Sequence, residues 1–192
     1  MTNKLKYFIA NWKMFGDLKS YKIIANVNKF NNKYNKIDNY KIVFCVPNTL
    51  IHIFSRKLKS KTILIGAQNS THHKESGPYT GSVNPTMLKA VGAKFVILGH
   101  YENRCEGETN ELIKKKLIES HRKNLKVILC IGESLNQKKQ KKTYQVIKNQ
   151  LRKILDKKTK PENIILAYEP IWCIGTNNLP KEIELRKIIT FI

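Results

Sequence analysis

The chain has 192 residues, enough for one sizeable hydrophobic core and at most two small domains. Hydrophobic residues make up 41% of it, and its longest apolar runs fall far short of the ~20 residues of a membrane span. The four cysteines lack C-x-x-C spacing, which argues against a zinc cluster or a redox pair. The N-terminal MTNKLKYFIANWK lacks the features of a signal peptide. We therefore expect a cytoplasmic protein with no membrane partner and with reduced, mostly buried thiols.

The formal net charge of +22, which comes mostly from lysine, allows two interpretations. It could attract nucleic acid or an anionic membrane. It could also reflect a bias toward Lys, Asn and Ile in which the lysines cover solvated faces. No RNA-binding motif and no interleaving of aromatic with basic residues accompanies the charge, which favours the second interpretation. We expect no specific nucleic-acid partner, and attraction of anionic metabolites instead.

Short β-rich runs alternate along the chain with stretches of helical periodicity. Each run is almost continuously apolar, as is typical of a parallel strand that is buried on both faces. Asn48 and Thr109 are candidate N-caps of two of the helices, and Ile183, Ile188 and Ile189 suggest one face of a last helix from Pro180 onward. The predicted strands are Lys6–Ala10, Lys41–Val46, Thr62–Ala67, Phe95–Leu98, Lys126–Cys130 and Ile164–Tyr168.

Six β/α units in succession predict a parallel α/β fold, and no linker divides residues 1–192 into separate domains. The pattern leaves two architectures open, a doubly wound sheet and part of a closed barrel. Neither G-x-G-x-x-G nor G-x-x-x-x-G-K-[ST] occurs, which weakens the case for a nucleotide-binding protein.

Polar residues follow three of the predicted strands, where functional residues of parallel α/β folds gather. Asn11 and Lys13 follow the first strand, His100 the fourth and Glu169 the sixth. Singly, each has an ordinary explanation, such as a solvated lysine, a loop histidine or a capping carboxylate. Together they place a base, an electrophile and a cation on one rim, and a closed sheet would bring them to one cavity.

Six segments resemble successive signature segments of the triosephosphate isomerase family, in the family's order and over nearly the whole chain. They are NWKMFG, GAQN, PYTGSVNPTML, VILGHYENRCEGETNELI, KVILCIGESL and LAYEPIWCIGTN. The resemblance implies a TIM (β/α)8 barrel, of which about six β/α units are present in this chain. It also implies a cytoplasmic homodimer of glycolysis and gluconeogenesis that needs no metal and no cofactor. Such an enzyme interconverts dihydroxyacetone phosphate and D-glyceraldehyde 3-phosphate through an enediolate.

The resemblance also implies roles for individual residues. Glu169 matches the base that carries the proton, His100 the neutral electrophile and Lys13 the cation that faces the substrate. Asn11 matches a substrate-binding residue and Glu102 a supporting carboxylate, while Thr80 lies in the segment that inserts into a second subunit. The lid that closes over the substrate is expected to comprise Pro170, Ile171, Trp172, Cys173, Ile174, Gly175 and Thr176, and the backbone N–H of Gly175 would bind the phosphate.

Several positions depart from the family pattern. Tyr101 replaces a serine, Asn177 and Asn178 replace Gly-Lys after the lid, and the last two β/α units lie beyond the sequence. On these grounds we expect a partial or truncated isomerase of low activity. Two alternatives remain: a non-catalytic, lysine-rich relic that binds polyanions, and a different sugar-phosphate barrel enzyme.

Overall fold

The computed structural model describes residues 5–34, 39–157 and 159–192. Strands and helices alternate along the chain, and three short 3-10 turns lie at Leu18–Ser20, Pro161–Asn163 and Ile171–Cys173. The strands are β1 (Lys6–Asn11), β2 (Tyr40–Cys45), β3 (Ile63–Ala67), β4 (Phe95–Leu98), β5 (Lys126–Ile131) and β6 (Ile164–Tyr168). The helices are α1 (Tyr21–Tyr34), α2 (Asn48–Lys57), α3 (Pro85–Ala90), α4 (Tyr101–Cys105), α5 (Asn110–Arg122), α6 (Leu135–Lys139), α7 (Thr143–Ile154) and α8 (Glu182–Phe191).

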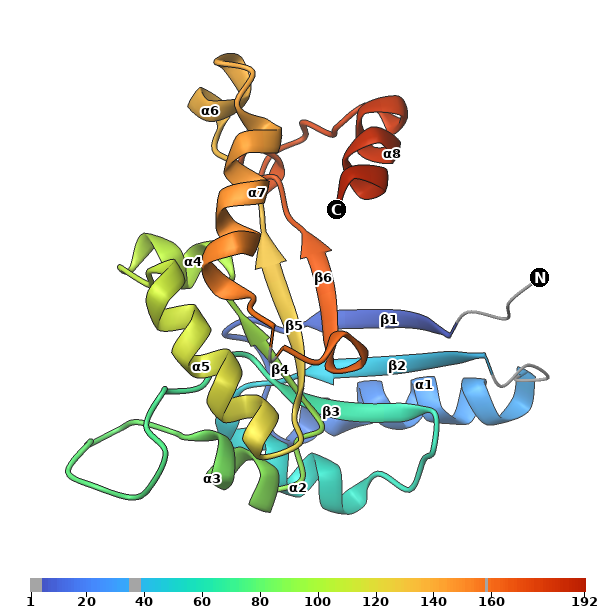
Figure 1. The fold of residues 1–192 in the computed structure, drawn as a ribbon. Coiled ribbons are helices and arrows are strands. Elements are labelled where there is room, and N and C mark those ends of the chain that lie inside the picture. Colours follow the sequence, from blue (N-terminus) through green and yellow to red (C-terminus); the bar gives the residue numbers. More distant parts are fainter. Residues whose placement is uncertain (1–4, 35–38, 158) are drawn as a thin grey trace.

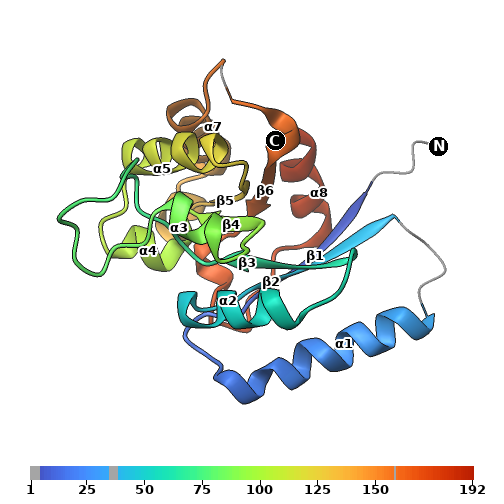
Figure 2. The same ribbon diagram turned by 90° about the horizontal axis from the view of Figure 1, so that it is seen from below.

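The six strands form one parallel sheet in chain order, from β1 at one edge to β6 at the other. The sheet curls strongly, so that β5 and β6 run at a steep angle to β1 and β2 (Figure 1). Viewed at right angles to this, the helices lie around the outside of the curl (Figure 2). Six parallel β/α units are the number predicted, and the curl makes the sheet part of a barrel rather than a flat, doubly wound sheet. All carboxyl ends of the strands therefore meet on one rim.

Element boundaries agree with the sequence predictions to within one residue at each strand end. Thr109 caps α5, since its side chain accepts a hydrogen bond from the N–H of Leu112 at 3.2 Å. The prediction for Asn48 was wrong: Asn48 is already helical, and Pro47 is the cap. The backbone of Pro47, with φ −50° and ψ 145°, lies outside the helical region. The N-cap therefore stands one residue earlier than expected, and the helix begins at Asn48.

The predicted apolar face of the last helix was also wrong. In α8 only Ile188 is buried, at 7% exposure, while Ile183 and Ile189 are 64% and 60% exposed. Residues five and six positions apart point in different directions on an α-helix, so the three isoleucines do not share a face.

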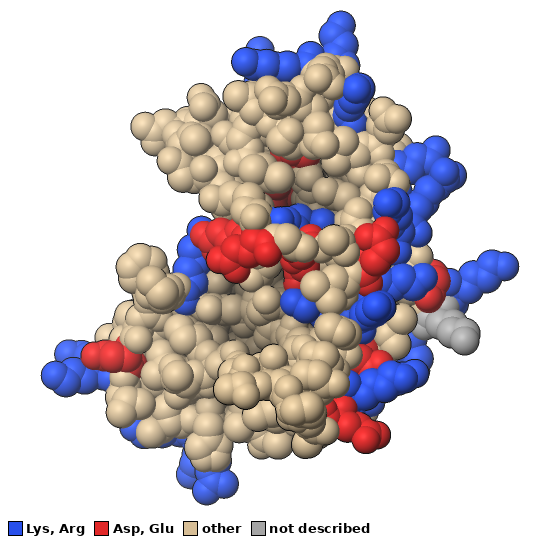
Figure 3. All heavy atoms as spheres, turned by 90° about the vertical axis from the view of Figure 1, so that its left-hand side faces the viewer, with Lys and Arg blue, Asp and Glu red and all other residues tan. Residues whose placement is uncertain are grey.

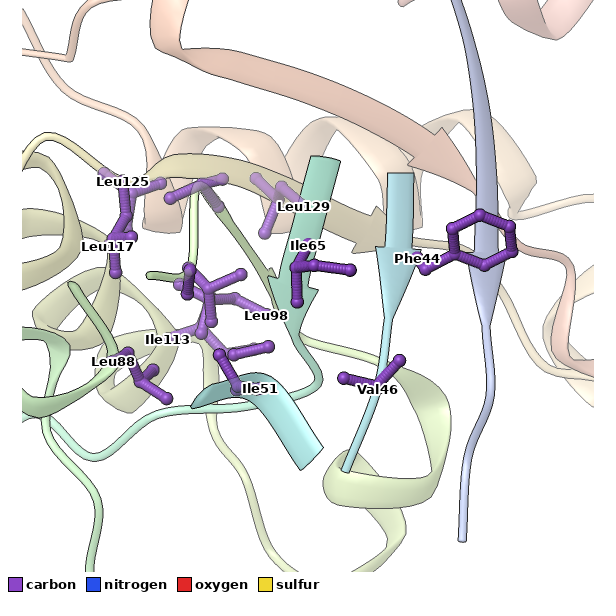
Figure 4. Packing of buried hydrophobic residues seen from close by; sticks show 14 of the residues in the cluster. Phe44, Val46, Ile51, Ile65, Leu88, Leu98, Ile113, Leu117, Leu125 and Leu129 are labelled. Atoms are coloured by element: carbon purple, nitrogen blue, oxygen red, sulfur yellow. The ribbon is translucent and has the colours of Figure 1, made fainter. Parts of the chain in front are cut away.

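The hydrophobic core has two layers that follow the alternation of side chains along the strands. The larger layer lies between the sheet and the surrounding helices, where Phe44, Leu98 and Leu129 of the strands pack with Ile51 and Ile113 of α2 and α5 (Figure 4). The smaller layer contains only strand residues among its buried members and fills the inner side of the curl: Val43, Cys45, Phe95, Ile97, Ile128 and Cys130. Burial on both faces explains the apolar runs of β2 to β5, whereas the edge strands β1 and β6 contain no buried residue.

Most charged side chains lie on the surface, although Glu108, Lys116, Glu119 and Glu133 are buried. On the face shown in Figure 3, lysine and arginine side chains lie mostly toward the outline, while acidic side chains gather near the middle of the face beside a hollow. Across the described segments, every helix is too short or too polar to span a lipid bilayer.

The cysteines are all free, but only two of the four are buried, fewer than the sequence suggested. Burial raises the pKa of the Cys45 thiol to about 12 and also raises the pKa of Cys130, whereas Cys105 is exposed on α4.

Because the thiolate is the reactive form, we expect a thiol reagent at pH 8 to label Cys105 rapidly, and Cys45 and Cys130 only after unfolding. Absorbance of released thionitrobenzoate with and without urea measures this, and Cys105→Ser should remove the fast phase. Rapid labelling of Cys130 in the folded chain would contradict the expectation.

Candidate active site

Four of the predicted site residues form a continuous line of polar contacts on the carboxyl rim of the sheet. The Nε2 atom of His100 lies 3.0 Å from Oε1 of Glu169, and Nζ of Lys13 lies 2.8 Å from Oε1 of Glu102. Glu102 in turn contacts His100. A cavity of about 350 Å³ opens beside this line, and its lining includes Asn11, Lys13, Gln68, His100 and Glu102. The curl of the sheet thus brings the ends of β1, β4 and β6 to one place.

The imidazole of His100 is oriented by the short helix that it caps. Gly99 follows β4 with φ +72°, a conformation that favours glycine, and His100 comes next as the N-cap of α4. The backbone N–H of Glu102 points at Nδ1 of His100 at 3.3 Å. Since that amide always carries its hydrogen, Nδ1 must be the acceptor, which assigns the proton of a neutral imidazole to Nε2. The side chain is only 6% exposed, so this Nε2–H is directed at Glu169 and shielded from bulk water.

Lys13 is held in an unusual backbone conformation. Its φ of +53° lies in the left-handed region, which is strained for a residue with a side chain. Two neighbours stabilise it: Oδ1 of Asn11 accepts from the N–H of Lys13 at 3.0 Å, and the amide of Gln68 donates to the Lys13 carbonyl at 2.8 Å. The hydrogen bond to Glu102 raises the pKa of the Lys13 ammonium. Lys13 therefore remains a cation through the neutral range.

Glu169 directly follows β6 and continues the pairing of that strand with β5, because its backbone N–H donates to the carbonyl of Ile131 at 2.8 Å. One carboxylate oxygen contacts His100. The other, Oε2, is buried and has no hydrogen-bond partner among the described residues. A carboxylate oxygen without a hydrogen-bond partner can accept a proton from a bound molecule once a movement of the side chain exposes it.

The predicted lid is anchored in its first half and exposed in its second. Nε1 of Trp172 donates to Oε1 of Glu133 at 2.9 Å, and the Nζ of Lys138 lies 3.5 Å above the indole ring. Residues 175–179 are exposed, and Gly175 has φ +68°. The remaining lid residues connect these two halves: Pro170 precedes the 3-10 turn of Ile171, Trp172 and Cys173, and Ile174 and Thr176 flank Gly175.

Glu133 is a site residue that sequence reasoning missed. It is 1% exposed, and its carboxylate also accepts from the hydroxyl of Tyr168, at 3.0 and 3.1 Å. Glu133 stands two residues after β5, so the same strand-end argument that selected Glu169 and His100 could have found it. Thr80, in contrast, is exposed in the loop between β3 and α3 and is not part of the cavity lining.

Residues 6–192 match the family model described as Triosephosphate isomerase. The chain belongs to the triosephosphate isomerase family. A triosephosphate isomerase of Alkaliphilus oremlandii is 37% identical over 186 residues, covering 95% of this chain and 73% of that protein. One from Buchnera aphidicola is 40% identical over 184 residues, covering 92% of this chain and 71% of that protein.

A solved structure of triosephosphate isomerase from Bartonella henselae matches with a TM-score of 0.87 and 31% identity. The match covers 97% of this chain and 73% of that chain. The family resemblance and the barrel architecture expected from the sequence are therefore confirmed. This triosephosphate isomerase family member spans about three quarters of the length of the relatives named here.

Proposed function

We propose that this chain interconverts dihydroxyacetone phosphate and D-glyceraldehyde 3-phosphate. The observation that supports this best is the 3.0 Å pair of His100 and Glu169 beside Lys13, in a chain of this family. His100 lines the cavity, and Glu169 lies directly behind it as a proton acceptor in contact with its Nε2. That combination suits a reaction in which a proton leaves one carbon and returns to its neighbour.

In the proposed reaction, Glu169 removes a proton from the carbon beside the carbonyl. The electron pair of that C–H bond forms the carbon–carbon double bond of an enediol(ate), and the carbonyl oxygen gains the negative charge. His100 turns its Nε2–H from Glu169 to this oxygen, and Lys13 lies close enough to offset the charge. A proton then passes from the hydroxyl oxygen on the deprotonated carbon to the former carbonyl oxygen, with His100 giving its Nε2 proton to the one oxygen and taking a proton from the other. Glu169 returns its proton to the former carbonyl carbon. The electron pair of the carbon–carbon double bond forms the new C–H bond, and the deprotonated hydroxyl oxygen becomes the new carbonyl, without any net change in oxidation state. No metal or cofactor enters this scheme.

The predicted residues Asn11 and Glu102, and Gln68, which the structure adds, have positioning roles in the proposal. Asn11 and Gln68 keep Lys13 in its strained conformation, and Glu102 keeps its ammonium beside the cavity. We also propose that the lid from Pro170 to Thr176 closes when the N–H of Gly175 binds the substrate phosphate, which would exclude water from the enediolate.

We propose a cytoplasmic homodimer built from one domain. The exposed loop that carries Thr80 projects away from the sheet (Figure 1), which suits contact with a second subunit. Four free cysteines suit a reducing compartment. Sedimentation of the purified chain measures the assembly state, and a monomer at micromolar concentration would contradict the dimer.

A coupled assay tests the activity directly. The purified chain should convert glyceraldehyde 3-phosphate to dihydroxyacetone phosphate, and in D₂O it should introduce solvent deuterium into the product. His100→Gln should lower kcat by about 10²-fold, since a single electrostatic donor contributes on that order. A folded chain with neither turnover nor deuterium incorporation above background would refute the proposal.

The contacts of Trp172 lead to a prediction for the lid. Lys138 stacks on the indole and also pairs with Glu184 of α8 at 3.3 Å, which ties the lid to its present position. Lys138→Met removes a cation–π contact worth about 0.5–1 kcal/mol at a partly exposed site, so closure should become about 2–5-fold more favourable. We expect inorganic phosphate, measured as a competitive inhibitor, to bind tighter by that factor. The neighbouring exposed Lys139→Met is the control, and unchanged phosphate affinity in Lys138→Met would contradict the prediction.

A further inference from the structure

We propose that Gln150 of α7 is a positioning residue for Glu169 and acts through Gly132. The inference rests on the proposed function, in which Glu169 is the base. Oε1 of Gln150 accepts from the N–H of Gly132 at 3.0 Å, and its Nε2 donates to the carbonyl of the same residue at 2.9 Å. One side chain thus satisfies both backbone polar groups of a buried residue, which would otherwise lack partners once β5 has ended.

Gly132 matters because its backbone packs directly on the peptide that joins the base to the lid. A Cβ atom at Gly132 would lie 2.0 Å from the carbonyl oxygen of Glu169 and 3.3 Å from the nitrogen of Pro170. Hydrogen bonds flank this contact on both sides, from Glu169 N to Ile131 O at 2.8 Å and from Ile171 N to Glu133 O at 3.1 Å. The position of Gly132 therefore determines where the chain carrying Glu169 can lie.

Gln150 is itself well anchored. It lies on α7 between Ile147 and Ile154, which are fully buried. The packing of these two side chains fixes the helix backbone from which the Gln150 amide extends. A long polar side chain from a packed helix thus sets the position of a glycine, and the glycine sets that of the base. Displacing a catalytic group by ~1 Å can cost on the order of 10²-fold in rate, so a loss of this support should be measurable in kcat.

The test replaces Gln150 with methionine, which keeps the length of the side chain and removes both hydrogen bonds. We expect kcat to fall about ten-fold or more, while KM and the inhibition constant of inorganic phosphate stay within about two-fold. Gln145→Met on the exposed side of the same helix is the control and should behave as wild type. Gln150→Glu keeps the acceptor for the Gly132 N–H and should give an intermediate kcat, and it replaces the methionine variant if that variant fails to fold.

A second readout does not depend on turnover. Amide hydrogen exchange of Glu169 and Ile171 should become about ten-fold faster in Gln150→Met and remain unchanged in Gln145→Met. If wild type isomerises and Gln150→Met retains its kcat and its exchange rates, the positioning role is wrong. If wild type does not isomerise, the proposed function fails, and the exchange rates alone decide whether Gln150 holds the Glu169 segment.

Discussion

Replacing Glu169 with aspartate is expected to lower kcat by about 10²-fold and to leave KM within a few-fold of wild type. Aspartate withdraws the carboxylate by about 1.5 Å, the length of one carbon–carbon bond, and a shift of that size can cost ~10²-fold in rate. The 3.0 Å contact between Glu169 and His100 would lengthen at the same time. Substrate affinity should change little, because the phosphate would be bound elsewhere, by the lid and Lys13.

Steady-state kinetics in both directions measures the effect of Glu169→Asp. The matched control is Glu162→Asp, at an exposed residue just before β6, which should retain wild-type kcat and KM. If Glu169→Asp kept kcat within about three-fold of wild type, Glu169 would not be the base. A rise in KM with constant kcat would instead indicate a role in substrate binding.

Replacing Glu108 with leucine is expected to destabilise the fold by about 3–5 kcal/mol, because it leaves a buried ammonium without its partner. The side chains of Glu108 and Lys116 form an ion pair and are only 4% and 9% exposed. Lys116 also donates to Asn69 at 3.0 Å, and Oε2 of Glu108 accepts from the N–H of Gly99 at 3.1 Å. The pair therefore supports the residue that precedes His100, and kcat should fall along with stability.

Urea unfolding followed by circular dichroism measures the loss. The control is Glu182→Ala, which breaks a pair with Arg186 in which both side chains are 76% exposed, and it should cost less than about 1 kcal/mol. Adding Lys116→Met to Glu108→Leu should recover part of the stability, since an apolar pair can replace a buried ion pair. A loss below about 1 kcal/mol for Glu108→Leu alone would contradict this account.

The sequence was sufficient to predict the strands and the rim residues. Strands such as Phe95–Leu98 are buried on both faces and therefore carry a continuous apolar run. His100 and Glu169 could be selected because functional side chains of parallel sheets follow the strand ends. The sequence predicted helix caps less accurately, because a cap depends on the backbone of a single residue. The N-cap of α2, for example, is Pro47 and not Asn48.

The supports of the site could not be read from local pattern. Lys13 and Glu102 are 89 residues apart in the chain, and Gln68 reaches back 55 residues to the Lys13 carbonyl. Gln150 is one of several glutamines with no distinguishing neighbours, and only the packing of α7 directs its amide at Gly132.

Composition, periodicity and motifs thus determined the elements, their order and the candidate side chains at the strand ends, because helical and strand patterns are set by residues close in sequence. Which of the remaining polar residues hold those side chains in place was decided by the curl of the sheet. Hydrogen bonds require donor and acceptor to meet within about 3 Å, and only the tertiary structure brings distant residues that close.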